Sequence, residues 1–215
     1  AGRVVCIDYS SINIAKPFMA NLHKFVEGSG FVVVLTDEHG YILELFGDED
    51  TLKNPMTDDF FLGGCWREEE AGTNAIGTAL VTAAPIQVSG AEHYCQKHHS
   101  LTCSSAPIFD TDRRLIGVLD MSGASHASHL HTLGIVVAAA EAIMAQLRVY
   151  QQNQELASVN HRLTNFFNTM SDGVIIVDNK GKVTELNPSA LELLGKSERE
   201  IKGVSVTRLL GGKES

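Results

Sequence analysis

The side chains most suited to chemistry lie close together in the segment EHYCQKHHSLTC, residues 92–103. Within eleven residues it holds His93, Cys95, His98, His99 and Cys103. Imidazole and thiolate groups are common ligands of zinc and iron, so a metal or redox site is one interpretation. The spacing matches no common pairing such as CxxC or HxxxH. The alternative is a pair of exposed loop histidines beside half-buried cysteines, and the sequence leaves both open.

A second group of histidines follows at His126, His129 and His131. Their separations do not place all three on one face of a helix. A site shared with His93 or His98 is conceivable, but no spacing supports it. Titration near neutral pH is the other role open to such residues.

Catalytic motifs are absent from the chain, which contains no GxSxG, P-loop, HExxH or GxGxxG pattern. The acidic run Glu68-Glu69-Glu70 is contiguous, so its carboxylates do not converge as a general acid and base would. We interpret it as a solvated approach to a helix that begins near Thr73, where negative charge is favourable. The sequence therefore predicts a protein region that is not an enzyme.

Composition excludes several classes of partner. The 215 residues carry a formal net charge of −9 and a pI of about 5.4, without the basic footprint that nucleic-acid binding requires. No apolar run reaches the length of a bilayer span, and the longest is Ile135–Ala140. We therefore expect neither direct nucleic-acid contact nor a membrane segment.

Cysteine usage indicates the compartment. The four cysteines are too few and too scattered for the disulfide framework of a secreted protein: Cys6, Cys65, Cys95 and Cys103. No signal peptide is recognisable, so we predict a cytoplasmic protein. The chain starts at Ala1 rather than Met, and we expect it to be a piece of a longer protein.

Hydrophobic periodicity and turn residues predict the elements that must position these side chains. Helical spacing and alternating apolar runs give a helix at 11–27, a hairpin at 31–48, a helix at 74–82 capped by Thr73, a strand at 86–88, a loop or short helix at 91–100, strands at 101–109 and 115–121, and one long helix at 129–167. Together they predict an α+β fold in which helices flank an antiparallel sheet.

Two segments carry a resemblance to a known family. They are WREEEAGTNAIGTALVTAAPIQVSGAEHY, residues 66–94, and CSSAPIFDTDRRLIGVLDMSG, residues 103–123. In order and spacing they resemble the amino-terminal GAF sensory domain of bacterial sigma-54-dependent transcriptional activators, of the acetoin-catabolism and dihydroxyacetone-regulator type. The resemblance implies a GAF domain over residues 1–133 and a small-molecule pocket between the sheet, a short helix and the surrounding loops.

The GAF resemblance implies a set of ligand-binding residues. One aromatic wall and several hydrogen-bonding groups would line the pocket: Trp66, Asn74, Thr78, His93, Tyr94, Cys103, Asp120 and Ser122. For each residue alone a structural role is the alternative. Trp66 would then be a core residue, Asn74 a helix-start residue and Asp120 a turn or cap acceptor. The expected ligand is a small organic effector, with a metal ion as the less favoured cofactor.

The last part of the chain, MSDGVIIVDNKGKVTELNPSALELLG, resembles the beginning of a PAS domain. We expect an incomplete PAS domain over residues 169–215. An internal repeat relates Val33–Leu45 to Val174–Leu186, with Asp37 at the position of Asp178. Either the two domains share an early hairpin of related architecture, or all such hairpins look alike.

Residues 134–168 form the predicted signalling helix, a coiled-coil linker between the two domains. Apolar residues recur at a spacing of seven, and asparagines occupy the second seam position; the seam is Val149, Asn153, Leu156, Asn160, Leu163 and Phe167. Buried asparagines favour a two-stranded, in-register pair at some cost in stability. We therefore predict a homodimer through this helix, whereas packing against the chain's own sheet is the alternative before about Tyr150.

The resemblance then implies the function. The chain would be the regulatory front end of an activator in which effector binding is passed through the dimeric helix to a downstream AAA+ ATPase and DNA-binding domain. The alternatives are a redox or metal sensor built on Cys95, His98, His99 and Cys103, and a module that binds a protein partner without a ligand.

Overall fold

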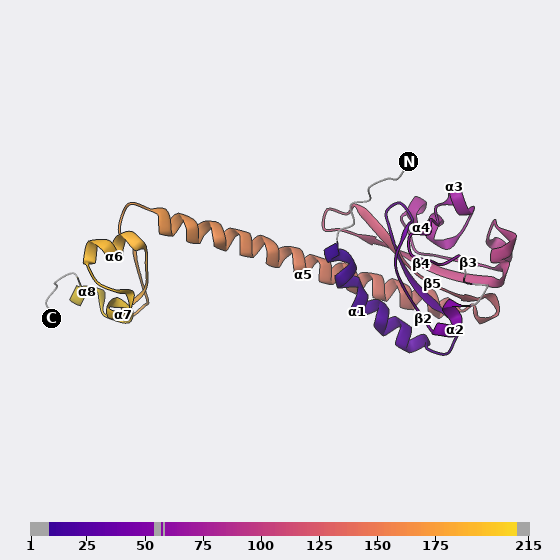
Figure 1. Ribbon diagram of the computed structural model, residues 1–215, viewed down its shortest axis with the longest axis horizontal. Coiled ribbons are helices and arrows are strands. Elements are labelled where there is room, and N and C mark those ends of the chain that lie inside the picture. The colour runs from indigo at the N-terminus through magenta and orange to yellow at the C-terminus, as the bar shows by residue number, and fades with distance from the viewer. Residues whose placement is uncertain (1–8, 54–56, 58, 210–215) are drawn as a thin grey trace. The chain divides into compact units, whose positions relative to one another are not determined.

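Figure 1 shows the computed structural model of the chain, which describes residues 9–53, 57 and 59–209. The chain divides into two compact units, Ala1–Gln151 and Gln152–Ser215. This division falls within the predicted linker, and the predicted domain boundaries at residues 133 and 168 stay predictions. Cys6 lies outside the described residues.

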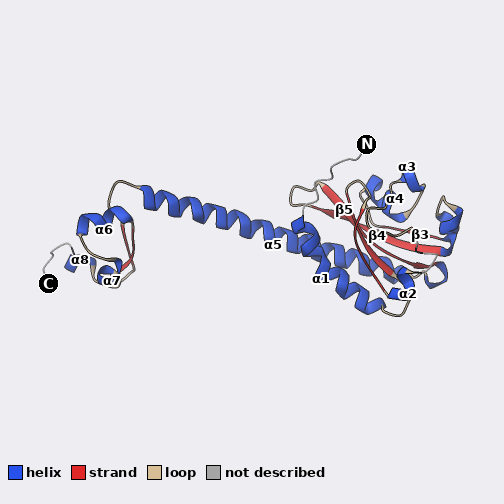
Figure 2. Ribbon diagram, in the orientation of Figure 1, coloured by secondary structure: helices blue, strands red, loops and turns tan. Residues whose placement is uncertain are grey.

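The first unit is built on one antiparallel sheet (Figure 2). Its strands lie in the order β2-β1-β5-β4-β3 and comprise β1 (Val32–Asp37), β2 (Ile42–Gly47), β3 (Ile86–Ser89), β4 (Leu101–Phe109) and β5 (Leu115–Ala124). Strand β5 continues past the predicted end at Met121, because Leu101 of β4 pairs with Ala124. The predicted α+β fold is confirmed.

One face of the sheet is covered by two helices, α1 (Tyr9–Val26) and the first part of α5 (Leu130–Thr169). Met19 of α1 and Val136 of α5 are buried against Val33 and Leu119 of the sheet. These helices present apolar side chains at a spacing of three to four, which forms one buried stripe. Burial of that stripe removes apolar surface from water and holds the helices on the sheet.

The opposite face is covered by helix α4 (Ala75–Thr82) and the loops before it, which include the short helices α2 (Glu49–Leu52) and α3 (Glu68–Ala71). Ile76 and Trp66 pack there against Val32, Val34 and Val118. Every residue of β1 is buried, because both faces of this strand are covered. The expected alternation of buried and exposed side chains is therefore lost in β1.

The cap of α4 differs from the prediction. The side chain of Asn74, not Thr73, accepts a hydrogen bond from the backbone N–H of Gly77 at 2.8 Å. Thr73 lies one residue outside the helix, and its carbonyl accepts from the N–H of Tyr94 instead. The acidic run is also more ordered than predicted, because Glu68–Ala71 forms its own helix, α3.

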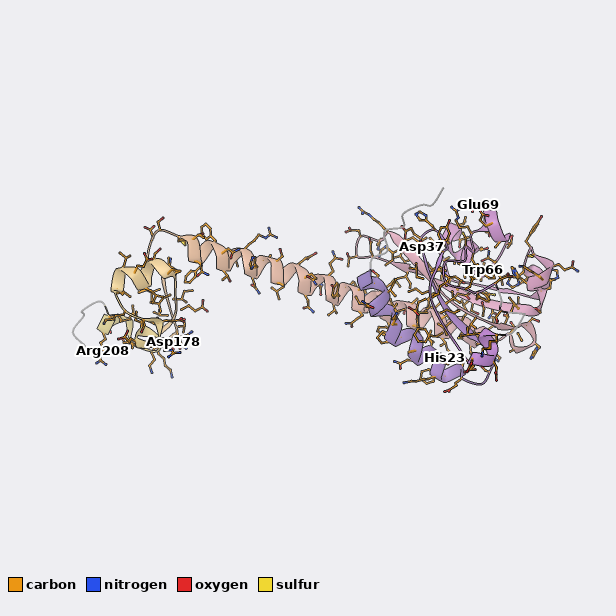
Figure 3. The ribbon with its side chains drawn as sticks, viewed as in Figure 1. His23, Asp37, Trp66, Glu69, Asp178 and Arg208 are labelled. Carbon is orange, nitrogen blue, oxygen red and sulfur yellow. The ribbon has the colours of Figure 1, made fainter. Side chains whose placement is uncertain are left out.

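Three hairpins of the chain close with the same turn. In each, the Oδ1 atom of an aspartate accepts hydrogen bonds from the backbone N–H groups two and four positions later; these residues are Asp37, Asp110 and Asp178, of which Figure 3 labels the first and last. The hairpin at Asp110 lies outside the sequence repeat yet has the same turn. Shared turn chemistry therefore accounts for the repeat.

The second unit contains a small hairpin, β6 (Ile175–Val177) and β7 (Val183–Leu186), followed by α6 (Pro188–Leu194), α7 (Glu198–Ile201) and α8 (Val206–Leu209). Ser197 and Glu200 form a capping box at the start of α7, with each side chain bonded to the other residue's backbone. Asn187 caps α6 and also bonds the backbone around Val174. These contacts hold the residues just before β6 to the start of helix α6.

Helix α5 confirms the predicted long helix at 129–167. By length and composition alone it could cross a membrane, since its most apolar 18-residue window has a mean hydropathy of 1.6. The alanine-rich part of the helix raises this average, although the longest uninterrupted apolar run, Ile135–Ala140, is much shorter than a bilayer span. Val136, Ala140 and Ile143 of this helix instead pack against the sheet of the first unit.

Candidate functional site

A pocket of about 220 Å³ lies in the first unit beside Trp66, which is labelled in Figure 3. Residues 59–71 and 95–98, which are far apart in the sequence, form its wall. Its lining combines aromatic, charged and thiol groups: Asp59, Phe61, Gly64, Cys65, Trp66, Glu70, Ala71, Cys95, Lys97 and His98.

Backbone hydrogen bonds hold the residues in and next to the two lining segments. The N–H of Trp66 donates to the carbonyl of Gly40 at 2.8 Å, which ties the first segment to the β1–β2 turn. The N–H of Tyr94 donates to the carbonyl of Thr73 at 3.0 Å. The ring of Tyr94 covers Gly72, where a Cβ atom would lie 2.5 Å from the ring. Gly72 is required for this contact, since its φ of 70° is also unfavourable for other residues.

Trp66 forms the aromatic floor of the pocket and is only 3% exposed. Its indole stacks on Phe60 at a centroid distance of 4.3 Å and on His98 at 5.0 Å. The indole N–H donates to the carbonyl of Asp59 at 3.3 Å. The stack fixes the ring orientation, so the pocket has a preformed aromatic surface.

Charged groups form one side of the pocket. Asp59 accepts hydrogen bonds from Lys97 at 2.5 Å and from Nε2 of His98 at 2.9 Å. Partial burial raises the pKa of Asp59, but these two partners together outweigh it and lower the pKa below its ordinary value. The same hydrogen bond raises the pKa of Lys97. The carboxylate and the ammonium group therefore carry opposite charges at neutral pH.

A second polar group is buried between β4 and β5. Asp120 accepts hydrogen bonds from the hydroxyls of Ser105 and Ser122, both at 2.6 Å. Burial raises the pKa of Asp120 to about 6, although the two hydroxyls act in the opposite direction. Nε2 of His93 lies 3.3 Å from Sγ of Cys103, the cross-strand neighbour of Ser122. Burial also raises the pKa of the Cys103 thiol and lowers the pKa of His93.

The predicted ligand-binding residues therefore fall into three places. Only Trp66 lines the pocket described above. The buried polar group between the strands gathers His93, Cys103, Asp120 and Ser122.

Three predicted ligand-binding residues have structural roles. Asn74 uses its whole amide, because its NH₂ also donates to the carbonyls of Trp66 and Gly72. Thr78 donates to Glu68, and the exposed Tyr94 covers Gly72. Ligand contact by these residues stays a prediction.

The cluster of cysteines and histidines stays partly in contact in the structure, since the rings of His93 and His98 meet edge to face at a centroid distance of 6.2 Å. Cys95 and His98 line the pocket, whereas His93 contacts Cys103, and Nε2 of His99 contacts the carbonyl of His93 at 3.1 Å. Among residues 9–53, 57 and 59–209, no three His, Cys, Asp or Glu side chains gather closely enough to hold a metal ion.

The second histidine group is not part of either site. His129 and His131 stack on each other at 4.4 Å, at the start of α5.

Sequence reasoning missed most of the pocket. Asp59, Phe61, Gly64, Cys65, Glu70, Ala71 and Lys97 line it without having been predicted. One signal was available, because Cys65 directly precedes the tryptophan that the family resemblance had already marked. The others depend on how the loop folds back, which no local pattern reports.

Comparison with known proteins places this geometry in a family. Residues 5–146 match the family model described as "MimR, N-terminal domain". The chain belongs to this family. Beyond the MimR N-terminal domain, residues 161–214 match a PAS domain model. Both matches confirm the resemblance predicted from the sequence, in kind and in order.

Relatives of this MimR N-terminal domain are transcriptional regulators. A signal-transduction and transcriptional-control protein of Clostridium beijerinckii is 35% identical over 199 residues, which cover 93% of this chain and 32% of that protein. The acetoin dehydrogenase operon transcriptional activator AcoR of Bacillus subtilis is 36% identical over 149 residues, covering 69% and 25%. The chain thus spans about a third or less of these relatives.

Among solved structures, the Escherichia coli DhaR(N)–DhaL complex contains a chain of the same fold as the MimR N-terminal domain and its helix. The superposition has a TM-score of 0.80 and covers 92% of this chain and 67% of that one, at 21% identity. At this identity the similarity shows the fold alone.

Proposed function

We propose that this chain is the signal-receiving region of a cytoplasmic transcriptional activator, and that a small organic effector binds in the pocket beside Trp66. The pocket is the observation that carries the proposal, because it is preformed and combines an aromatic floor with a few polar groups. The family membership supports the regulatory role. The chain itself is proposed to catalyse no reaction and to contact neither nucleic acid nor membrane.

The covalent path out of the first unit supports signal transmission. Strand β5 runs through Ser125–Ala127 directly into α5, so a shift of the sheet is passed to the start of the helix. The side chains of Val149, Leu156 and Leu163 are 47%, 59% and 61% exposed. We propose that this seam pairs with a second copy, and that effector binding favours one arrangement of the pair. The downstream recipient would be an AAA+ ATPase followed by a DNA-binding domain.

A protein partner is the second candidate signal. The side chains of Phe61 and Tyr94 are 57% and 81% exposed; Phe61 lines the pocket, and Tyr94 packs on Gly72, which follows the lining residue Ala71. Exposed aromatic residues are enriched where proteins bind one another. The DhaR(N) chain of similar fold was solved in a complex with DhaL, which supports this alternative.

Native mass spectrometry and thermal-shift measurements on the full chain test the effector proposal. Because acetoin is named in the descriptions of relatives, a panel of small metabolites would begin with it. We expect a binding compound to raise the melting temperature of the parent and of the exposed-site control Val81→Leu. Ala71→Leu, which fills the pocket, should abolish that shift. Equal shifts in Ala71→Leu, or no binding by any compound, would contradict the proposal and favour a protein signal.

A further inference from the structure

Helix α5 carries an uncovered row of apolar side chains in the second unit. Leu156 and Leu163, seven residues apart, form its centre, and Val159 and Phe166 beside them are 45% and 67% exposed. We call these four residues the apolar stripe. The neighbouring Phe167 is half-buried and lies next to the stripe rather than in it. Contiguous apolar surface of this kind is stabilised when a partner removes it from water.

The spacing of the apolar stripe indicates what covers it. A repeat of seven residues keeps one face of a helix toward a second helix along its whole length. In the described part of the second unit, the helices α6, α7 and α8 contain seven, four and four residues, each fewer than the span from Leu156 to Phe166. Helix α1 is longer, but Ala15, Met19 and Leu22 bury its apolar face against the sheet. The partner that fits is therefore α5 of a second copy.

Two such helices can meet along either of two lines. At 3.6 residues per turn, Val159 lies about 60° to one side of Leu156, and Asn160 lies about 40° to the other side. Phe166 and Phe167 flank the next leucine of the stripe in the same way. The apolar seam thus uses Val159 and Phe166 beside the leucines, whereas the asparagine seam predicted from the sequence uses Asn160 and Phe167.

The two seams differ in what they bury. The apolar seam places Val159 and Phe166 between the helices and leaves the exposed Asn153 and Asn160 in water, which is the less costly arrangement. The asparagine seam buries both amides, which must then hydrogen-bond to their counterparts in the second copy. Since the leucines belong to both seams, a rotation of each helix by about 50° about its axis exchanges the seams without separating the pair.

We propose that α5 pairs with a second copy through these two alternative seams, that the apolar seam is the more populated, and that the rotation between them is the signal. This inference rests on the proposed pairing of α5 and specifies its register and its motion. An element with two packed arrangements responds to a small difference in free energy, which is what effector binding in the first unit supplies.

Disulfide crosslinking between copies of the full chain tests the seams. Val159→Cys and Asn160→Cys report on the apolar and the asparagine seam, and Ser158→Cys on the opposite face is the control. Each variant is oxidised with copper phenanthroline, and its rate of dimer crosslinking is corrected for that of the parent with its native cysteines. We expect Val159→Cys to crosslink at least about tenfold faster than Ser158→Cys, and Asn160→Cys at an intermediate rate, because a disulfide forms only where the two helices face each other closely.

Two adjacent substitutions should then shift the balance in opposite directions. Gln152 occupies the position of Val159 one repeat earlier, and Asn153 occupies that of Asn160. Gln152→Leu should raise the ratio of the crosslinking rates at positions 159 and 160, and Asn153→Leu should lower it, each by about tenfold, because a leucine is added to one seam only. A ratio that neither leucine changes, or that both change in the same direction, would overturn the proposal.

The failure of this inference can be separated from the failure of the proposed pairing. Crosslinking through Asn160→Cys alone would refute the apolar seam and leave the pairing intact. Rates at both reporters no higher than that of Ser158→Cys, in a chain that sedimentation equilibrium shows to be dimeric, would refute both seams and place the contact elsewhere. A chain that is monomeric by sedimentation would refute the pairing together with this inference.

Discussion

At the residue scale, Asp120 makes the free energy of unfolding of the first unit depend on pH. The pKa of this buried carboxyl is about 6 in the folded chain, against an ordinary value of 3.8. Between these values the unfolded chain has released a proton that the folded chain keeps. The free energy of unfolding therefore falls as pH rises through this window, by about 3 kcal/mol in total, and is level above it.

The substitution Asp120→Asn should remove this pH dependence, because the amide does not ionise. Urea unfolding at about pH 4.5 and about pH 7.5 measures the change. His93, whose pKa is lowered by burial, acts in the opposite sense as pH falls below 6.5. For this reason the test compares the free energy of unfolding of the variant with that of the parent at each pH. If that difference is the same at both values, Asp120 does not hold its proton in the folded state.

Asn74 is the second residue with a measurable role. Its side chain caps α4 and bonds the carbonyls of Trp66 and Gly72. Asn74→Ala should lower the free energy of unfolding by about 1–3 kcal/mol, because the cap and two buried carbonyl partners are lost. Thr73→Ala is the matched control, with an expected change below about 0.5 kcal/mol. A larger loss in Thr73→Ala would restore Thr73 as the cap.

At the element scale, the three aspartate turns differ in one backbone position. Gly40 and Gly181 have φ of 78° and 72°, whereas Arg113 occupies the corresponding place of the β4–β5 hairpin with φ of 61°. A left-handed conformation costs a residue with a Cβ about 1–2 kcal/mol. This hairpin therefore closes at a higher cost than the other two, and its long strands compensate.

Arg113→Gly should raise the free energy of unfolding by about 0.5–1 kcal/mol, since relief of strain exceeds the entropy that glycine loses on folding. Thermal unfolding followed by circular dichroism would measure the gain. The neighbouring exposed Arg114, whose φ is not positive, provides the control Arg114→Gly, and we expect it to destabilise. Destabilisation by both variants would contradict the strain argument.

At the scale of the whole molecule, the seam of α5 determines the proposed oligomeric state. Burial of one leucine side chain contributes about 1.5–3 kcal/mol. The double variant Leu156→Lys, Leu163→Lys should therefore raise the dimer dissociation constant by at least about a hundredfold. Sedimentation equilibrium measures this constant, with Ser158→Lys as a control outside the seam. A parent chain that is monomeric at every concentration would contradict pairing through α5.

The elements and their order could be predicted from the sequence because they depend on local patterns. Helix α1, the hairpin of β1 and β2, and helix α5 each follow from periodicity and turn residues within a short window. The position of the α4 cap was one residue off. Thr73 and Asn74 are both good capping residues, and only the fold decides which of them faces the free N–H groups.

The site depends on tertiary structure. By itself the sequence determined the family, the α+β architecture and the long helix, since these are encoded in contiguous residues. Only the folded chain placed Cys65 and Cys95 in the lining of one pocket, and it buried Asp120 between two hydroxyls. The physical reason is that such neighbours are set by strand register and by close packing of a loop on Trp66, which join residues distant in the sequence.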